Sequence, residues 1–519
     1  MIMNKGMKES VMIPLALLMS AFLLRLYAAL VPGIIVPDGV IYIDTAKMIL
    51  AGQWERIAEF GVYSMYPFLI AAFHKVFADW ETAGRMISVV FGSLAVVPFY
   101  LLLKRMFDMR IALVAAIFFV VSPRLVEYSS NVVREPAFWC FALGALWAAW
   151  EGMVRKKWFL MTVASFFVGL SAVTRMEGAA LVPIIILWMG WYYLKLERSG
   201  IKTFLLFLLV FTVSFPILFF TPLYLLKNRV GKWEIGHVGS KIPYILSAGS
   251  ENAAEAFKKS IDDADVVSRV LSKNEYIYFL WESIYKPFRS YHVLLIFLFL
   301  IGIVRRKVIP RDVLKEVPIF IWCYIFLLVS LLYVSRTYYL STRHGMLISI
   351  PALAWVSMGF FELSDIVERV VAKFKPKWKN TRNVTVWCLV LICIIILPKT
   401  LSWSGYEKVE MKKAGKYLKM HGYITGTIAV EQRFNRLAFY ADADFVVIPV
   451  GMTHQKLHNF LRSNNVSLLV VDERTVDRTI DGFTKNVATM ALERLELREL
   501  KSYKDYSIAV FKLKNDRTT

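Results

Sequence analysis

The chain has 519 residues, of which 57% are hydrophobic and 15% aromatic, and its mean hydropathy is +0.52. This composition excludes an ordinary soluble domain and indicates a membrane protein. The formal net charge of +22 would suggest nucleic acid as the partner of a soluble protein. Here the basic residues gather in loops that flank apolar runs, where they face anionic lipid. We therefore expect membrane lipid, and no nucleic acid, as a partner.

Long apolar runs recur along the chain, and one bilayer crossing needs roughly 20 such residues. The first run, residues 12–31, predicts an uncleaved helix because no small-residue cleavage pattern follows it. Ten more runs follow at 85–103, 111–123, 135–150, 158–174, 179–194, 203–226, 290–304, 317–335, 344–361 and 384–402. The sequence thus predicts a polytopic α-helical membrane protein with about 11 transmembrane helices.

The distribution of Lys and Arg between the short loops predicts the orientation. Cytoplasmic loops retain positive charge, and the loops at 104–110, 155–157 and 369–382 are strongly basic. This pattern places the N-terminus in the cytoplasm of a multi-pass cell-membrane protein. An odd number of spans then places the C-terminal segment outside the cytoplasm.

Three segments outside the spans are long enough to have structure of their own. Residues 32–84 and 227–287 form outer loops, the second with a charged helical stretch around ENAAEAFKKSIDDADVVSRVL. The third begins near Gly405, where strand and helix patterns alternate. We therefore predict a transmembrane domain over residues 1–404 and a soluble extracytoplasmic α/β domain over residues 405–519.

The pattern within the C-terminal segment predicts particular elements. EKVEMKKAGKYLKMHG is typical of an amphipathic helix that ends at Gly422, and HQKLHNFLRSNNV predicts another helix. TGTIAVEQ, VSLLVVDE and DYSIAVFKLK predict strands. The first strand is followed by no glycine-rich phosphate loop, so no nucleotide site is expected.

Charged residues gather at the predicted outer ends of the spans. Ionisable groups are costly next to a bilayer, so a cluster on one side indicates a working site. The set comprises Asp38, Asp44, Glu127, Arg134, Glu135, Arg175, Glu177 and Arg343. Asp44 lies six residues beyond Asp38 and on another face of the predicted helix, so we expect it to be solvated.

Several segments together resemble one enzyme family. PDGVIYIDTAKMILAGQW resembles the first outer loop of polyprenyl-phosphate-sugar glycosyltransferases of glycosyltransferase family 39. These are enzymes of the protein mannosyltransferase and aminoarabinose-transferase type, and they have the GT-C fold. The match rests on Asp38, Tyr42, Ala46 and Gly52. NVVREPAFWCF, LSAVTRMEGAALVP and STRHGMLISIPALAW resemble later motifs, with Met176 in place of proline and His344 in place of tyrosine. The likeness covers roughly residues 12–361 and extends to the C-terminal domain.

The resemblance implies an inverting enzyme that moves a monosaccharide from a polyprenyl-phosphate donor to an acceptor, which is a protein, a lipid or a glycan. Such chemistry needs a carboxylate to deprotonate the acceptor hydroxyl and cations to hold the leaving phosphate. Asp38 is the expected base, and Gly39 stands where the family has a second acidic residue. The expected donor-binding residues are Tyr42, Arg134, Glu135, Arg175, Glu177 and Arg343.

Five of these residues also have a purely structural interpretation. Asp38 is a suitable N-cap for a helix that begins near Val40. Arg134 and Glu135 suit a snorkelling arginine followed by a glutamate at a helix N-terminus. Arg175 and Glu177 suit an ion pair that locks the tight connection between two spans.

The sequence shows no metal-ligand spacing among its histidines, and nothing in it requires a metal or another cofactor. The rival function is a multi-spanning transporter or flippase of a lipid-linked substrate. Transporters place polar sites near the bilayer midplane and often contain inverted repeats. We find no clear repeat, and the charged residues lie at the predicted helix ends.

Overall fold

The computed structural model describes residues 5–31, 33–60, 64–197, 201–230, 274–304, 313–374, 382–402, 409–449, 451–490, 492–495 and 507–513. The chain forms two compact units, one of Met1–Leu30 with Tyr42–Ser402 and the other of Val31–Ile41 with Trp403–Thr519. The charged helical stretch predicted at residues 251–271 lies outside the described residues.

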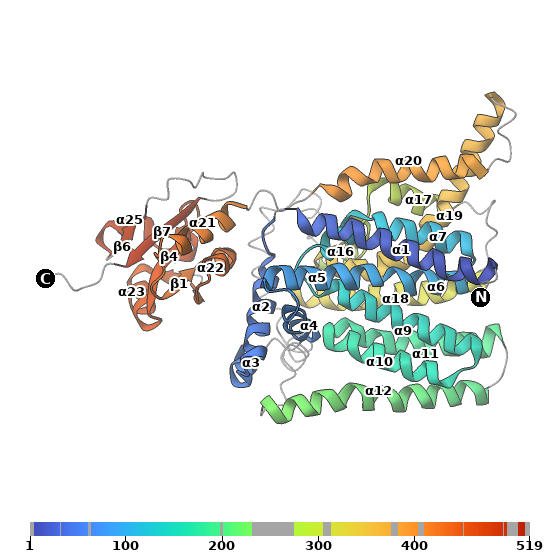
Figure 1. Cartoon of the computed structure of the whole chain (residues 1–519), viewed down its shortest axis with the longest axis horizontal. Helices are drawn as coiled ribbons and strands as arrows, with labels where there is room; N and C mark the ends of the chain where they lie inside the picture. The colour runs from blue at the N-terminus through green and yellow to red at the C-terminus, as the bar shows by residue number, and fades with distance from the viewer. Residues whose placement is uncertain are drawn as a thin grey trace. The chain divides into compact units, whose positions relative to one another are not determined.

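Long helices lying side by side make up the first unit (Figure 1). They are α1 (Lys5–Leu30), α5 (Trp80–Leu94), α6 (Val96–Met106), α7 (Met109–Val121), α8 (Pro123–Ser129), α9 (Glu135–Arg155), α10 (Trp158–Thr174), α11 (Leu181–Trp191), α12 (Ile201–Val230), α16 (Glu275–Arg289), α17 (Val293–Val304), α18 (Val313–Thr337), α19 (Thr342–Phe374) and α20 (Arg382–Leu401). Shorter helices are α2 (Pro37–Leu50), α3 (Trp54–Phe60) and α4 (Met65–His74). All eleven predicted apolar runs fall on these helices.

The number of spans is close to the prediction. Within the described ranges, eight helices are long and apolar enough to cross a membrane, and two bent pairs, α7 with α8 and α16 with α17, raise the number to ten. The eleventh predicted span is α10, which has 17 residues and is therefore only about 26 Å long. It ends early because Arg175 adopts an extended conformation, with φ −147° and ψ 136°.

The bend between α7 and α8 has an identifiable cause. Pro123 has no N–H group, so carbonyls in the last turn of α7 lack their usual helical partners. The fully buried Arg25 donates from Nη2 to the carbonyl of Phe119 at 3.5 Å, and Thr400 Oγ1 donates to the carbonyl of Val121 at 2.7 Å. A buried arginine in a span often marks a functional site, but this one caps a broken helix.

A second proline leaves a backbone carbonyl of α18 without its helical donor. Pro318 cannot donate to the carbonyl of Leu314, and the indole Nε1 of Trp191 donates to that oxygen instead, at 3.2 Å. Trp188 Nε1 donates to the carbonyl of Pro318 at 2.9 Å. Two indoles of α11 thus fix the start of α18.

Helices α17 and α19 cross at two glycines. A Cβ added to Gly302 would lie 1.9 Å from the carbonyl oxygen of Trp355, and one added to Gly359 would lie 1.8 Å from that of Leu298. Small residues let helix backbones approach closely in a membrane, where dispersion contacts replace the hydrophobic effect. The crossing therefore requires both glycines.

The second unit is a small α/β fold. Its main sheet has the strand order β2-β1-β4-β7-β6, in which β1 is parallel to β2 and β4, and β7 is antiparallel to β4 and β6. The strands are β1 (Thr427–Val430), β2 (Phe445–Val447), β4 (Val466–Asp472), β6 (Leu492–Arg494) and β7 (Ile508–Leu513). Strands β3 (Met452–Thr453) and β5 (Ile480–Asp481) pair separately, and the main helices are α21 (Val409–Met420), α22 (Asn435–Ala441) and α23 (His454–Ser463).

Successive residues of β4 point to opposite faces of the sheet, and those on both faces are buried. Leu469 and Val471 pack in one cluster with Leu457 of α23, whereas Leu468 and Val470 are equally buried outside that cluster. Burial on both faces explains the unbroken apolar run VSLLVV, which is typical of a central strand.

We expect Gly359→Ala to destabilise the first unit by about 1–3 kcal/mol or more, because its Cβ would overlap a backbone oxygen. Gly190→Ala is the matched control, since the nearest atom to its added Cβ lies at 3.9 Å. The control should be neutral or stabilising by up to roughly 1 kcal/mol, because alanine favours helix over glycine. Thermal unfolding in detergent checks both, and equal melting of the two variants would contradict the crossing.

Candidate functional site

Arg175 lies at the centre of a buried ion-pair network. It follows the last residue of α10, and its Nη1 donates to Glu135 Oε1 at the start of α9. Its Nη2 donates to Glu177 Oε1 at 2.7 Å and its Nε to Glu177 Oε2 at 3.3 Å. The Arg175 and Glu135 side chains are only 4% and 1% exposed. Two glutamates therefore hold one guanidinium away from bulk solvent.

The backbone returns Glu177 to this position through a short 3₁₀ turn, η1 (Met176–Ala180). A Cβ on Gly178 would lie 2.5 Å from the amide nitrogen of Ala172 and 2.7 Å from the carbonyl oxygen of Ser171. The turn can fold back against α10 only because residue 178 has no side chain. The glycine of the TRMEG motif thus has a packing role.

Arg134 joins the network from the residue before α9. Its Nη1 donates to the carbonyl of Thr174 at 3.4 Å, and its Cζ lies 5.9 Å from the centroid of the Tyr42 ring, a cation–π distance. Tyr42 in turn meets the Tyr66 ring edge to face at 5.3 Å. Ser64 Oγ donates to the same Thr174 carbonyl at 3.1 Å. Helices α2 and α4 are thereby packed beside the end of α10.

Helix α19 supplies the last two members. Arg343 Nη1 lies 3.7 Å from Glu135 Oε1, and His344 Nε2 lies 3.4 Å from Glu177 Oε1. The His344 ring stacks on Tyr333 of α18 at 4.8 Å between centroids. Residues from α2, α9, α10, η1, α18 and α19 therefore converge on one site.

The charges of this network do not cancel. Its three arginines and two glutamates carry a net charge of +1 (3 − 2), with His344 not counted. Burial would lower the pKa of Arg175, but Glu177 and Glu135 outweigh it and raise that pKa above its usual value. Because Arg175 donates three hydrogen bonds to carboxylates, Arg134 and Arg343 are the cations better placed to receive an added anion.

Some polar atoms of the network lack a hydrogen-bond partner within the described part of the chain. They include Arg134 Nε, Glu135 Oε2 and His344 Nδ1, all buried. A buried polar atom without a partner costs about 1–3 kcal/mol. A donor and at least one acceptor thus remain to be satisfied by water or by a ligand.

The structure brings together six of the seven residues predicted for the site, namely Tyr42, Arg134, Glu135, Arg175, Glu177 and Arg343. The seventh, Asp38, belongs to the second compact unit. It lies within the first turn of α2, which begins at Pro37, and not at an N-cap before Val40. The chemical roles of all seven stay predictions.

Two other charged residues of the predicted set pair locally. Asp44 lies 3.8 Å from Lys47 within α2, and Glu127 lies 2.5 Å from Arg124 within α8. Among the described residues, no group of three or more His, Cys, Asp or Glu side chains is arranged to hold a metal ion. The charged part of the site consists of arginine–carboxylate pairs.

The sequence did not lead us to place His344, Tyr333 or Thr174 among the site residues. His344 directly follows Arg343 in STRHGM, and this adjacency to a predicted site residue was a usable signal. Tyr333 and the Thr174 carbonyl gave none, because an aromatic residue in a span and a backbone oxygen leave no distinctive pattern.

The chain is similar to one protein family and to several solved structures. The family model described as dolichyl-phosphate-mannose-protein mannosyltransferase matches residues 64–224. ArnT from Cupriavidus metallidurans in the apo state is similar in structure, with a TM-score of 0.59 at 12% identity over 98% of each chain. The same protein bound to undecaprenyl phosphate matches with a TM-score of 0.57 at 13% identity, over 97% of this chain and 98% of its own. The Archaeoglobus fulgidus oligosaccharyltransferase in the apo form matches with a TM-score of 0.56 at 12% identity, over 89% of this chain and 70% of its own. No curated protein sequence matches.

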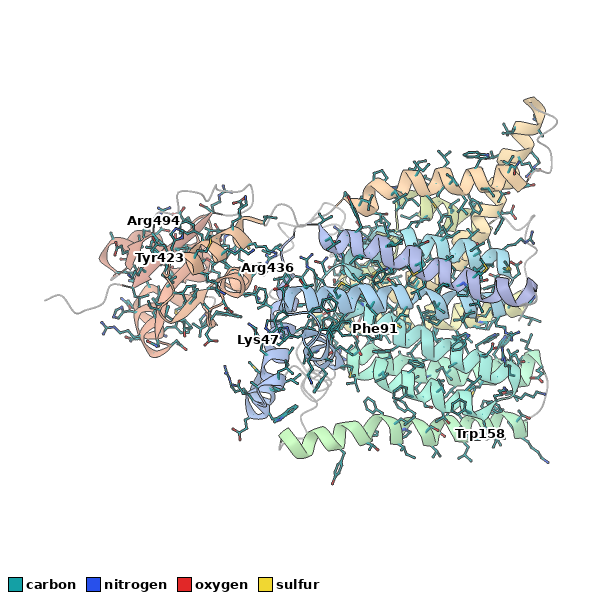
Figure 2. All side chains as sticks on the ribbon, in the orientation of Figure 1. Lys47, Phe91, Trp158, Tyr423, Arg436 and Arg494 are labelled. Carbon is teal, nitrogen blue, oxygen red and sulfur yellow. The ribbon has the colours of Figure 1, made fainter. Side chains whose placement is uncertain are left out.

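These similarities confirm the resemblance that the motifs indicated and the predicted GT-C fold. Together with the eight to ten candidate spans among the described helices, they establish a multi-pass membrane protein. The cluster lies at the opposite end of α10 from Trp158, which is labelled in Figure 2.

We expect Arg175→Met to destabilise the first unit by about 3–5 kcal/mol, because it leaves two buried carboxylates uncompensated. The double variant Arg175→Met with Glu135→Gln should recover part of that loss. Arg369→Met is the control, since Arg369 pairs with Asp365 on an exposed surface, where a pair contributes about 0–1 kcal/mol. Thermal unfolding of the purified proteins checks the order, and an unaffected Arg175→Met would show that the network is not needed for folding.

Proposed function

We propose that this chain is a GT-C glycosyltransferase that moves a monosaccharide from a polyprenyl-phosphate donor to an acceptor outside the cytoplasm. The observation that carries this proposal is the buried arginine–carboxylate cluster at one end of an apolar helix bundle. A site at a helix end suits a substrate whose headgroup lies at the membrane surface and whose tail lies in the bilayer. The ArnT neighbour was solved with undecaprenyl phosphate bound, which supports a polyprenyl phosphate as the lipid partner.

Arg134 and Arg343 are the proposed phosphate ligands. Arg343 is 30% exposed and its Nη1 lies 3.7 Å from Glu135 Oε1, and its planar fork has the geometry that suits a phosphate. Arg134 has an Nε without a partner among the described residues. Two guanidinium groups would stabilise the negative charge that develops on the leaving phosphate.

Asp38 is the proposed general base. It takes the proton of an acceptor hydroxyl while the hydroxyl oxygen attacks the anomeric carbon of the sugar. The bond between that carbon and the phosphate oxygen breaks, and the electron pair leaves with the lipid phosphate. A single displacement of this kind inverts the anomeric configuration.

The lipid tail has a candidate location in the first unit. Helices α16 to α19 line an open apolar cavity of about 300 Å³, whose lining includes Pro287, Tyr291, Phe320 and Ile348. Ile348 lies four residues beyond His344 on α19, so the cavity begins about one helical turn from the polar network. An isoprenoid chain would bury its apolar surface there.

The unsatisfied acceptors support a position for the sugar beside Glu135 and His344. A phosphate has oxygens only and cannot donate to Glu135 Oε2. A carboxylate beside His344 Nε2 favours the proton on that nitrogen, so Nδ1 is an acceptor in the neutral ring. Sugar hydroxyls donate hydrogen bonds. We therefore assign Glu135 and His344 to the sugar, and Arg134 and Arg343 to the phosphate.

The proposed orientation follows from the basic loops, with the N-terminus in the cytoplasm and the C-terminal α/β domain of residues 405–519 outside. The acceptor, whether protein, lipid or glycan, would reach the site from that side. A transporter would place its polar site near the bilayer midplane, whereas these charges lie at helix ends.

Asp38→Asn should reduce sugar transfer by about 10²–10⁴-fold, because a general base typically contributes that much. Donor binding should change little, since no phosphate ligand is removed. Proteoliposomes with radiolabelled polyprenyl-phosphate sugars and a membrane extract as acceptor source measure both. Asp44→Asn is the control, because Asp44 pairs with Lys47 in the same helix. Label that crosses the bilayer without donor consumption would instead support a transporter.

His344→Phe should raise the KM for the sugar donor about tenfold, which corresponds to roughly 1.4 kcal/mol, the size of one hydrogen bond. The substitution keeps a ring against Tyr333 and removes both nitrogens. His344→Asn, which retains an acceptor near Nδ1, should be affected less. Binding of sugar-free polyprenyl phosphate, measured by competition, should not change in either variant. An equal loss for both ligands would contradict the assignment to the sugar.

A further inference from the structure

The segment that leads into α2 packs with the C-terminal unit, although about 400 residues separate them in sequence. The amide of Ile35 donates to the hydroxyl of Tyr440 at 2.8 Å, across 405 positions of the chain. Lys412 Nζ donates to the carbonyl of Gly33 at 3.1 Å, across 379 positions. Residues 31–41 accordingly belong to the same compact unit as Trp403–Thr519.

The contact of Ile35 with Tyr440 is buried, and that of Lys412 with Gly33 is partly buried. Ile34 and Ile35 are 3% and 1% exposed, and Tyr440 is 8% exposed. Lys412 Nζ also lies 4.8 Å from the centroid of the Tyr440 ring, so its charge is held over the aromatic face. Two backbone groups of one short segment are therefore fixed by two side chains in a setting where an unmade hydrogen bond is costly.

The two side chains come from helices that are packed tightly against each other. Lys412 lies on α21 and Tyr440 on α22. A Cβ on Gly415 would lie 2.4 Å from the carbonyl oxygen of Leu437, so the backbones of the two helices nearly touch. Strand β1 precedes α22 and lies inside the sheet. The anchor for residues 33–35 is thus a well-packed part of the α/β fold.

The anchored residues stand directly before Asp38. Ile35 is followed by Val36, by Pro37, whose ring restricts φ, and then by Asp38 in the first turn of α2. The amide of Gly39 donates to the carbonyl of Val36 at 2.9 Å, which closes that turn. Fixing the backbone at Ile35 therefore fixes the direction in which the first turn of α2 begins.

We propose that Tyr440 and Lys412 are positioning residues for Asp38, so that the C-terminal domain holds the base in place. This inference rests on the proposed function. A general base must lie within hydrogen-bonding distance of its proton, and small displacements at a reacting centre reduce the rate strongly. The arginines assigned to the donor belong to the other unit. Loosening the anchor therefore lowers kcat and leaves donor binding unchanged.

Tyr440→Phe tests this role, because it removes the hydroxyl that accepts from Ile35 and keeps the ring under Lys412. We expect kcat for sugar transfer to fall about tenfold, with the KM for the donor within twofold of the wild-type value. Lys412→Met should lower kcat in the same direction. Hydrogen exchange of peptides that cover residues 33–40 should become faster in both variants, and exchange in α9 and α19 should not change.

Tyr417→Phe is the matched control, since it makes the same chemical change on α21, where the Tyr417 ring stacks on His421. It should leave kcat and the exchange of residues 33–40 unaltered. A Tyr440→Phe variant with faster exchange but wild-type kcat would overturn the inference while leaving the proposed function intact. If the wild-type protein transfers no sugar, the proposed function fails, and the exchange measurement still decides whether Tyr440 anchors the segment.

Discussion

The ion pairs of Arg175 are the constraint on which the site depends. A guanidinium buried between two carboxylates is tolerated only where each charge has its partner in place, since an uncompensated buried charge is strongly destabilising. Glu135 opens α9, Arg175 ends α10 and Glu177 lies in the turn that leads into α11. Satisfying these charges therefore fixes three helix ends relative to one another. The remaining members, from α2 and α19, pack around ends that are already fixed.

Backbone carbonyls of the bundle likewise need hydrogen-bond donors where prolines occur. Prolines 123 and 318 each leave backbone carbonyls without a helical donor, and Arg25, Thr400 and Trp191 supply donors from other helices. Irregular backbone within a membrane is stable only where protein groups satisfy it. The first unit can thus contain broken helices without exposing polar backbone to lipid.

The fold was largely predictable from the sequence because apolar runs of span length and strand-like alternation are local patterns. The eleven runs fall on helices, and the predicted elements of the C-terminal segment correspond to α21, β1, α23, β4 and β7. Charge in an apolar context also identified Arg134, Glu135, Arg175, Glu177 and Arg343, which the structure brings together. Helix α22 and strand β2 were not predicted because each is short and its stability comes from packing. The Thr174 carbonyl and the anchor of Ile35 depend on contacts between distant segments, which leave no local pattern.

The composition of the second unit from two distant parts of the chain has a consequence for biosynthesis. Residues 31–41 leave the ribosome early, whereas Lys412 and Tyr440 are made more than 370 residues later. Contacts of such long sequence separation form late, because the entropy cost of ordering the intervening chain comes before the stabilising free energy of the contacts. The start of α2 therefore lacks these partners until the whole bundle has been inserted. A protein truncated before its last hundred residues would insert its helices and still lack Tyr440, so this architecture links the support of the segment before α2 to synthesis of the C-terminal unit.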